Sequence, residues 1–112
     1  MDCVFCGLDN LVLENELAQA VWDIHPVSRG HLLVMPKRHV ESYFDARAEE
    51  KQAMWALVDQ ARDMIIEEYK PGGFNIALND GKCAGQTVMH AHLHLIPRYG
   101  EMASGSVFPE LK

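Results

Sequence analysis

The histidines of this chain are unevenly spaced, and their spacing is the first sign of a chemical site. The sequence contains six histidines, and three of them alternate with apolar residues in the run His90-Ala91-His92-Leu93-His94. Successive side chains of a β-strand point to opposite faces, so the three imidazoles would share one face while Ala91 and Leu93 face a core. The alternative is a half-exposed strand whose polar face happens to be histidine, but threonine, lysine or glutamate would be the usual residues there. We therefore predict a functional histidine strand.

The length of this strand limits what the three rings can do together. At a rise of about 3.3 Å per residue, the Cα atoms of His90 and His94 would lie roughly 13 Å apart, too far for both rings to bind one zinc ion easily. One end of the strand would then bind a metal and the other end would perform chemistry.

Two cysteines near the N-terminus supply half of a metal site. Cys3 and Cys6 have the Cys-x-x-Cys spacing, which occurs in metal sites and in redox pairs. The redox motif lies between a strand and a helix of a βαβ unit, and we expect no strand before this pair. Half of a metal site is the better interpretation, and the first histidine of the strand with a distant histidine would complete a Cys₂His₂ set.

Neutral hydrogen-bonding residues come directly before the histidine strand. Gly85, Gln86 and Thr87 precede it, and Asn79 precedes the turn before them. Glycine lets a backbone approach a ligand closely, and the other residues offer donors without positive charge, so this segment could cradle an anion. A neutral imidazole beside it could attack phosphorus and form a phosphoramidate intermediate.

The composition limits the class of protein. The chain has 112 residues, of which 48% are hydrophobic, and a net charge of −6, which fits a single folded domain over residues 1–112. Nucleic acid is an unfavourable partner for an acidic chain. No apolar run reaches the roughly 18 residues of a membrane span, and the N-terminus lacks a signal-peptide pattern. We expect a cytoplasmic protein with no membrane partner, and the odd number of cysteines argues against a disulfide framework.

The pattern of apolar residues predicts an α+β fold. A helix over residues 46–69, capped by Asp45, is indicated by apolar residues at helical spacing, namely Met54, Leu57, Val58, Ala61 and Ile65. Strands are expected at 11–13, 17–23, 31–35, 74–79 and 87–96. These elements favour a five-stranded antiparallel sheet with one long helix, together with a loop or short helical turn at 7–10.

Three segments together resemble the histidine triad (HIT) family of nucleotide hydrolases and transferases. They are residues 85–98, which hold the Gly-Gln-Thr and His-x-His-x-His motifs, residues 30–39, and the cysteine segment 3–6. The resemblance covers nearly the whole chain and favours the zinc-bearing bacterial and archaeal branch. It implies an antiparallel sheet of five strands with a long helix, usually paired as a homodimer across that helix and a strand.

The family pattern also implies roles for individual positions. His92 matches the nucleophile that attacks the α-phosphate, His94 binds a phosphoryl oxygen, and His31 supports the triad from the next strand. Other positions match residues that contact the nucleotide: Asp23 for the ribose hydroxyls, Ile24 and Val21 for the base, and Asn79, Gly85, Gln86 and Thr87 for the phosphate or leaving group. In zinc-bearing members four positions bind a structural zinc ion, and they are Cys3, Cys6, His39 and His90.

The resemblance implies a hydrolase that forms a nucleotidyl-histidine intermediate from a purine nucleoside phosphate. The substrate would be a nucleoside phosphoramidate or a dinucleoside polyphosphate. Asn79 is closer to the phosphoramidase-like branch, whereas the chain after Arg98 lacks the aromatic C-terminal segment of that branch. The alternative function is a non-catalytic nucleotide- or zinc-binding regulatory module. Cys83 matches no family position, and we interpret it as a filler of its loop.

Overall fold

A five-stranded antiparallel sheet is the centre of the fold, as the sequence predicted. The computed structural model describes residues 3–8 and 10–100. The strands are β1 (Leu13–Glu14), β2 (Ala18–Trp22), β3 (Leu32–Pro36), β4 (Gly73–Leu78) and β5 (Leu93–Arg98). Their order across the sheet is β1-β2-β3-β5-β4, with each neighbouring pair antiparallel. The C-terminal tail from residue 101 lies outside the described residues.

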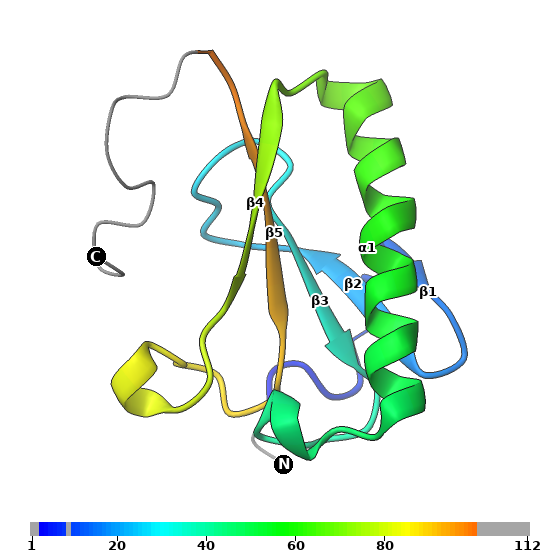
Figure 1. Ribbon diagram of the computed structural model, residues 1–112, viewed down its shortest axis with the longest axis vertical. Coiled ribbons are helices and arrows are strands. Elements are labelled where there is room, and N and C mark those ends of the chain that lie inside the picture. Colours follow the sequence, from blue (N-terminus) through cyan, green and yellow to red (C-terminus); the bar gives the residue numbers. More distant parts are fainter. Residues whose placement is uncertain (1–2, 9, 101–112) are drawn as a thin grey trace.

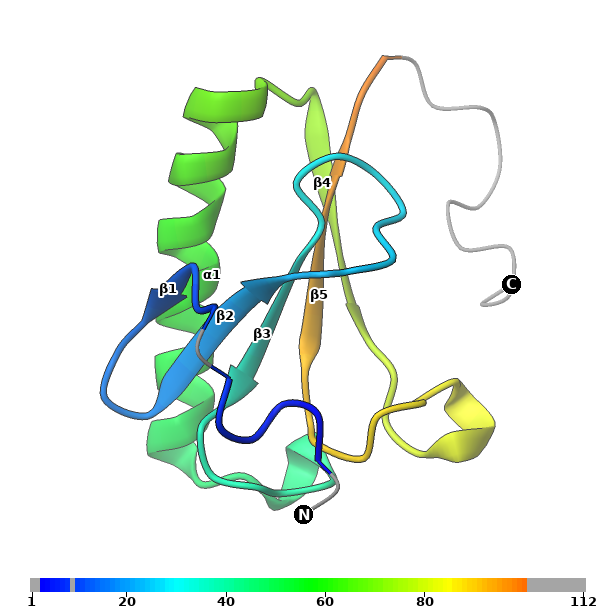
Figure 2. The same ribbon diagram turned by 180° about the vertical axis from the view of Figure 1, so that it is seen from behind.

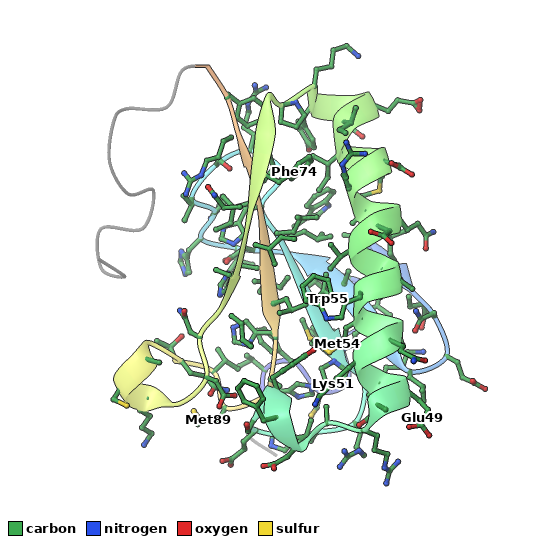
Figure 3. All side chains as sticks on the ribbon, in the orientation of Figure 1. Glu49, Lys51, Met54, Trp55, Phe74 and Met89 are labelled. Carbon is green, nitrogen blue, oxygen red and sulfur yellow. The ribbon has the colours of Figure 1, made fainter. Side chains whose placement is uncertain are left out.

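The long helix α1 (Ala48–Tyr69) packs against one face of this sheet (Figure 1). All five residues of its predicted apolar face are buried, and they pack on Ala18 and Ala20 of β2, Leu32 and Val34 of β3, and Leu93 and Leu95 of β5. Figure 3 shows Met54 on the side of α1 that faces the sheet. Within the described part of the chain, no helix is apolar and long enough to cross a bilayer.

The helix begins two residues later than predicted, and Asp45 does not cap it. The N-cap is Arg47, whose backbone N–H donates to the Glu50 carboxylate at 2.7 Å. Asp45 instead ends the short 3₁₀ helix η1 (Tyr43–Asp45), which Ser42 caps by accepting from the Phe44 amide at 3.1 Å. A second 3₁₀ helix, η2 (Lys82–Ala84), carries Cys83. The described residues around the expected turn at 7–10 form no helix.

The other face of the sheet is covered by two loops. The N-terminal segment and the loop between β2 and β3 lie on the side away from α1 (Figure 2). The alternation of β3 explains this second layer, because Leu33 and Met35 point away from the helix and pack with Phe5 and Val21. The N-terminal segment, η1 and η2 also gather at one end of the sheet, where β3 ends and β5 begins (Figure 1).

The predicted histidine strand is too long at its start. β5 begins at Leu93, so His90 and His92 precede the strand and only His94 lies in it. Leu93 pairs with Val34 of β3, and the ladder stops near Pro36, which has no backbone N–H to extend it. The Ala91 amide donates instead to the Val40 carbonyl at 2.7 Å, which turns the chain away from the sheet. The three rings therefore do not form one row on a strand.

Candidate functional site

A cavity of about 380 Å³ opens on the sheet face that the helix does not cover. His92, His94 and Thr87 are among the residues that line it. Most of the wall is apolar, and it includes both residues predicted for the base pocket, Val21 and Ile24. A cavity with an apolar wall and a few convergent polar groups is the usual form of a small-molecule site.

His92 is buried at this cavity, and its hydrogen bond determines which ring nitrogen carries the hydrogen. Nδ1 of His92 lies 2.8 Å from the carbonyl oxygen of His90. A carbonyl can only accept, so Nδ1 carries the hydrogen and Nε2 of the neutral ring keeps a free lone pair. Burial lowers the pKa of His92, although the His90 carbonyl and Asp23 oppose the shift. A neutral ring with a bare Nε2 is the state that a nucleophilic histidine needs.

His94 and His31 form a second imidazole pair next to His92. Nε2 of His31 lies 2.9 Å from Nδ1 of His94, and the rings of His92 and His94 are 5.1 Å apart between centroids. Burial, followed by the neighbouring His92 and His31, lowers the pKa of His94 to about 4. Burial also lowers the pKa of His31, against the effect of Asp23, whose Oδ2 lies 3.4 Å from Nε2. The structure thus brings together the three histidines that were predicted to be catalytic, and Asp23, which was predicted to bind the ribose, lies next to them.

The predicted anion cradle separates into two parts. Thr87 lines the cavity, whereas Gln86 is buried and its side-chain amide bonds to three backbone groups. Gln86 accepts from the Gly81 amide at 2.7 Å and donates to two carbonyls, so its side chain holds the loop together. Gly85 adopts a φ of +98°, and a Cβ at this position would lie 3.2 Å from the side-chain nitrogen Nδ2 of Asn79. Asn79, Gly85 and Gln86 therefore shape the loop that carries Thr87.

The four predicted metal ligands also meet in space. The Sγ atoms of Cys3 and Cys6 and one nitrogen each of His39 and His90 all lie within 4.8 Å of one another. Nε2 of His90 donates to the Pro36 carbonyl at 2.7 Å, which leaves the Nδ1 lone pair directed at Cys3 Sγ, 3.2 Å away. Nδ1 of His39 lies 3.5 Å from Cys6 Sγ. Two thiols and two imidazole lone pairs form the donor set of a closed structural zinc site, so these residues fit that metal.

Some residues of the site were missed by the sequence reasoning. The ring of Phe5 contacts both the predicted metal ligand His90 and the cavity residue His92. Its centroid is 5.9 Å from that of His90 and 5.1 Å from that of His92. Val4 and Leu8 form part of the cavity wall. Their only signal in the sequence is that they are apolar residues close to a cysteine pair, which does not distinguish a cavity wall from a core.

Comparison with known proteins identifies related sequences. The sequence pattern of the HIT domain matches residues 8–101. "Protein hit" of Bacillus subtilis is 37% identical over 106 residues, which are 89% of this chain and 73% of that protein. A bis(5'-adenosyl)-triphosphatase of Dictyostelium discoideum is 41% identical over 83 residues, 74% of this chain and 56% of that protein. An adenylylsulfatase of Arabidopsis thaliana is 31% identical over 103 residues, 87% of this chain and 52% of that protein.

Solved structures give the same result for the fold. A HIT family protein from Bacillus anthracis superposes with a TM-score of 0.84 at 38% identity, over 99% of this chain and 86% of that one. A Zn-bound histidine triad family protein from Mycobacterium smegmatis superposes with a TM-score of 0.78 at 38% identity, over 87% of this chain and 75% of that one. Because the HIT pattern spans most of the sequence and these relatives share its fold, the chain belongs to the HIT family.

Proposed function

We propose that this protein is a nucleotide hydrolase in which Nε2 of His92 attacks the α-phosphorus of a nucleoside phosphate. The observation that supports this most is the hydrogen bond from His92 Nδ1 to the His90 carbonyl, which leaves Nε2 unprotonated at the cavity. Relatives named as a triphosphatase and a sulfatase of adenosine compounds support the same class of substrate.

The proposed reaction has two displacements. In the first, the Nε2 lone pair forms a P–N bond while the bond between phosphorus and the leaving group breaks, and the leaving group takes up a proton from solvent. In the second, the oxygen of water bonds to phosphorus, the P–N bond breaks with its electron pair returning to Nε2, and water releases a proton, so that a nucleoside monophosphate and neutral His92 result. Hydrogen-bond donors from His94 and Thr87 would stabilise the charge that develops on the phosphoryl oxygens.

The rest of the nucleotide would lie along the cavity. Val21 and Ile24 would contact the base, because the wall around them is apolar. Asp23 would accept hydrogen bonds from the ribose hydroxyls, since its carboxylate reaches the cavity one residue after β2 ends. Asn79, Gly85 and Gln86 would act by holding the loop that presents Thr87.

The Cys3, Cys6, His39 and His90 set would hold a structural zinc ion. With four protein ligands the site would leave no open position on the zinc ion, so the metal would stabilise the N-terminal segment and would supply no chemistry to the substrate. His90 belongs to both parts of the site, because its ring faces the thiols and its carbonyl orients His92.

The proposal is tested by trapping the intermediate. The protein is mixed with adenosine 5′-phosphoramidate or diadenosine triphosphate labelled on the α-phosphorus, and the reaction is stopped in alkaline denaturant, where a phosphohistidine bond survives. We expect label on the wild type and none on His92→Ala, with turnover reduced by at least about a thousandfold. Unchanged binding of adenosine monophosphate by His92→Ala would show that the variant is folded.

Three outcomes distinguish the alternatives. The relative rates on the two substrates identify the leaving group as an amine or a nucleotide. Binding of adenosine monophosphate by the wild type without turnover of either substrate would overturn the proposal and favour a regulatory module. Wild-type turnover by His92→Ala would remove His92 as the nucleophile.

A further inference from the structure

We infer that the backbone amide of Val27 fixes the tautomers of His31 and His94, so that His94 presents an N–H to the bound phosphate. This inference assigns a positioning role to a residue of the β2–β3 loop, and it rests on the proposed function for its consequence in catalysis. The tautomers themselves can be measured whether or not the protein is a hydrolase.

The first step is the hydrogen bond between Val27 and His31. The Val27 amide nitrogen lies 3.0 Å from Nδ1 of His31. An amide N–H can only donate, so Nδ1 must be an acceptor and cannot carry a hydrogen. A neutral imidazole has one N–H, so in His31 it is on Nε2, and the doubly protonated ring would lose this contact.

The second step is that the tautomer of His31 determines the tautomer of His94. Nε2 of His31 lies 2.9 Å from Nδ1 of His94, so the Nε2–H of His31 donates and Nδ1 of His94 accepts. The single hydrogen of neutral His94 is then on Nε2. Asp23 Oδ2, 3.4 Å from Nε2 of His31, is also placed to favour a hydrogen on that nitrogen.

The result is that two adjacent rings have opposite tautomers. The His90 carbonyl makes His92 an Nδ1–H ring with a bare Nε2, while the Val27 amide makes His94 an Nε2–H ring. One ring can therefore attack phosphorus while its neighbour donates to a phosphoryl oxygen. With the reverse tautomers in His31 and His94, a bare Nε2 of His94 would face the negatively charged phosphate.

The same tautomers bear on a possible second metal site. Asp23, His31 and His94 place ligand atoms within 4.8 Å of one another, as a metal-binding trio would. A metal at Nε2 of His31 would have to displace the hydrogen that the Val27 amide keeps there. We therefore assign this trio to hydrogen bonding within the catalytic group.

The loop that carries Val27 is anchored near both of its ends. The His25 amide donates to Asp23 Oδ1 at 2.9 Å, and the His31 amide donates to the Ser28 carbonyl at 3.2 Å. The hydroxyl of Ser28 donates to the carbonyl of Pro97 in β5. Val27 is 60% exposed, so the contribution of this residue lies in its amide.

The direct test is NMR of wild-type protein labelled with ¹⁵N-histidine, which distinguishes protonated from bare ring nitrogens at neutral pH. The resonances of His31 are identified by their loss in His31→Gln. We expect Nε2–H in both His31 and His94, and Nδ1–H in His92. A His31 ring protonated on Nδ1 overturns the inference, whatever the activity of the protein.

A pair of variants then tests the role of the amide. Val27→Ala keeps the N–H and should keep the wild-type tautomers and kcat, whereas Val27→Pro removes the N–H. In Val27→Pro we expect a mixture of His31 tautomers and a kcat reduced about tenfold or more. A folded Val27→Pro with wild-type tautomers and kcat overturns the positioning role, and if this variant does not fold, the wild-type spectrum decides. Wild-type tautomers in a protein without turnover would instead count against the proposed function.

Discussion

Arg38 donates two hydrogen bonds to the carboxylate of Glu50, from Nε to Oε2 at 2.8 Å and from Nη2 to Oε1 at 2.9 Å. The Glu50 side chain is only 3% exposed, and it also accepts from the Arg47 amide at the start of α1. Arg38 adjoins the metal-site residue His39. This pair therefore ties the loop that carries His39 to the first turn of the long helix.

Glu50→Gln should lower the free energy of unfolding by about 2 kcal/mol, because the buried carboxylate of a charge-assisted pair loses its charge and one acceptor oxygen. The matched control is Glu49→Gln, which changes an exposed neighbour that points away from the fold in Figure 3. The control should stay within roughly 0.5 kcal/mol of the wild type. Urea unfolding of the three proteins measures both values, and equal effects of the two substitutions would contradict this role of Glu50.

The same pair predicts a pH dependence of stability. The hydrogen bond from Arg38 is the main reason that the pKa of Glu50 falls from 4.5 to about 2 in the folded protein. A lowered pKa means that the folded state binds a proton less readily than the unfolded state. The stabilisation is therefore complete above pH 4.5 and is lost as the pH falls toward 2. The stability difference between wild type and Glu50→Gln should shrink over that interval, and a constant difference would count against it.

Zinc analysis tests the metal site. We expect protein prepared with added zinc to bind one ion per chain, and Cys3→Ser to lose most of it, because the set needs all four ligands. Cys83→Ser is the matched control, since this free cysteine is exposed on η2. Chelation should lower the melting temperature of the wild type, because metal binding adds to the free energy of folding. Equal metal loss in both variants would contradict the site.

The proposed ribose contact can be tested with nucleotide analogues. Wild-type protein should bind adenosine monophosphate about tenfold or more tightly than its 2′,3′-dideoxy analogue, because the analogue leaves the Asp23 carboxylate without its hydrogen bonds. Asp23→Asn keeps an oxygen that can accept from the His25 amide and should lose most of this preference. Isothermal titration calorimetry measures the four affinities. An unchanged preference in Asp23→Asn would show that another residue recognises the ribose.

The homodimer that the family resemblance implies also stays a prediction. β4 lies at the edge of the sheet, and Ile76 on it is 46% exposed, so an edge-to-edge contact with a second copy would cover it. We expect a dimer in sedimentation experiments and a monomer for Ile76→Lys, while Phe44→Ser, on exposed η1, should stay dimeric. A wild type that is monomeric at every concentration would contradict the dimer.

The elements of the fold were predictable because their signals are local. The apolar spacing from Met54 to Ile65 identified the helix and its buried face, and the short apolar run before Pro36 identified a strand. The boundaries were less predictable, because they depend on contacts distant in the sequence. The start of β5 follows from the pairing of Leu93 with Val34 and from the Val40 carbonyl that takes the Ala91 amide.

The candidate site was also predictable in part. The sequence argument separated His90 from His94, and in the structure His90 lies with Cys3, Cys6 and His39 while His94 contacts His31. The hydrogen bonds by which Gln86 holds its loop, and the hydrogen bond from the Val27 amide to His31, could not be predicted. Each of them joins a side chain to a backbone group. Residue types alone do not reveal which backbone atoms a side chain reaches.

The segment from Cys3 to Leu8 contributes both to the predicted metal site and to the wall of the cavity. Its thiols belong to the Cys3, Cys6, His39 and His90 set, and its apolar residues Val4, Phe5 and Leu8 line the cavity beside His92. Oxidising the two thiols to a disulfide would remove their capacity to bind a metal. Oxidation of this cysteine pair would therefore also act on one wall of the cavity, although neither thiol lines it.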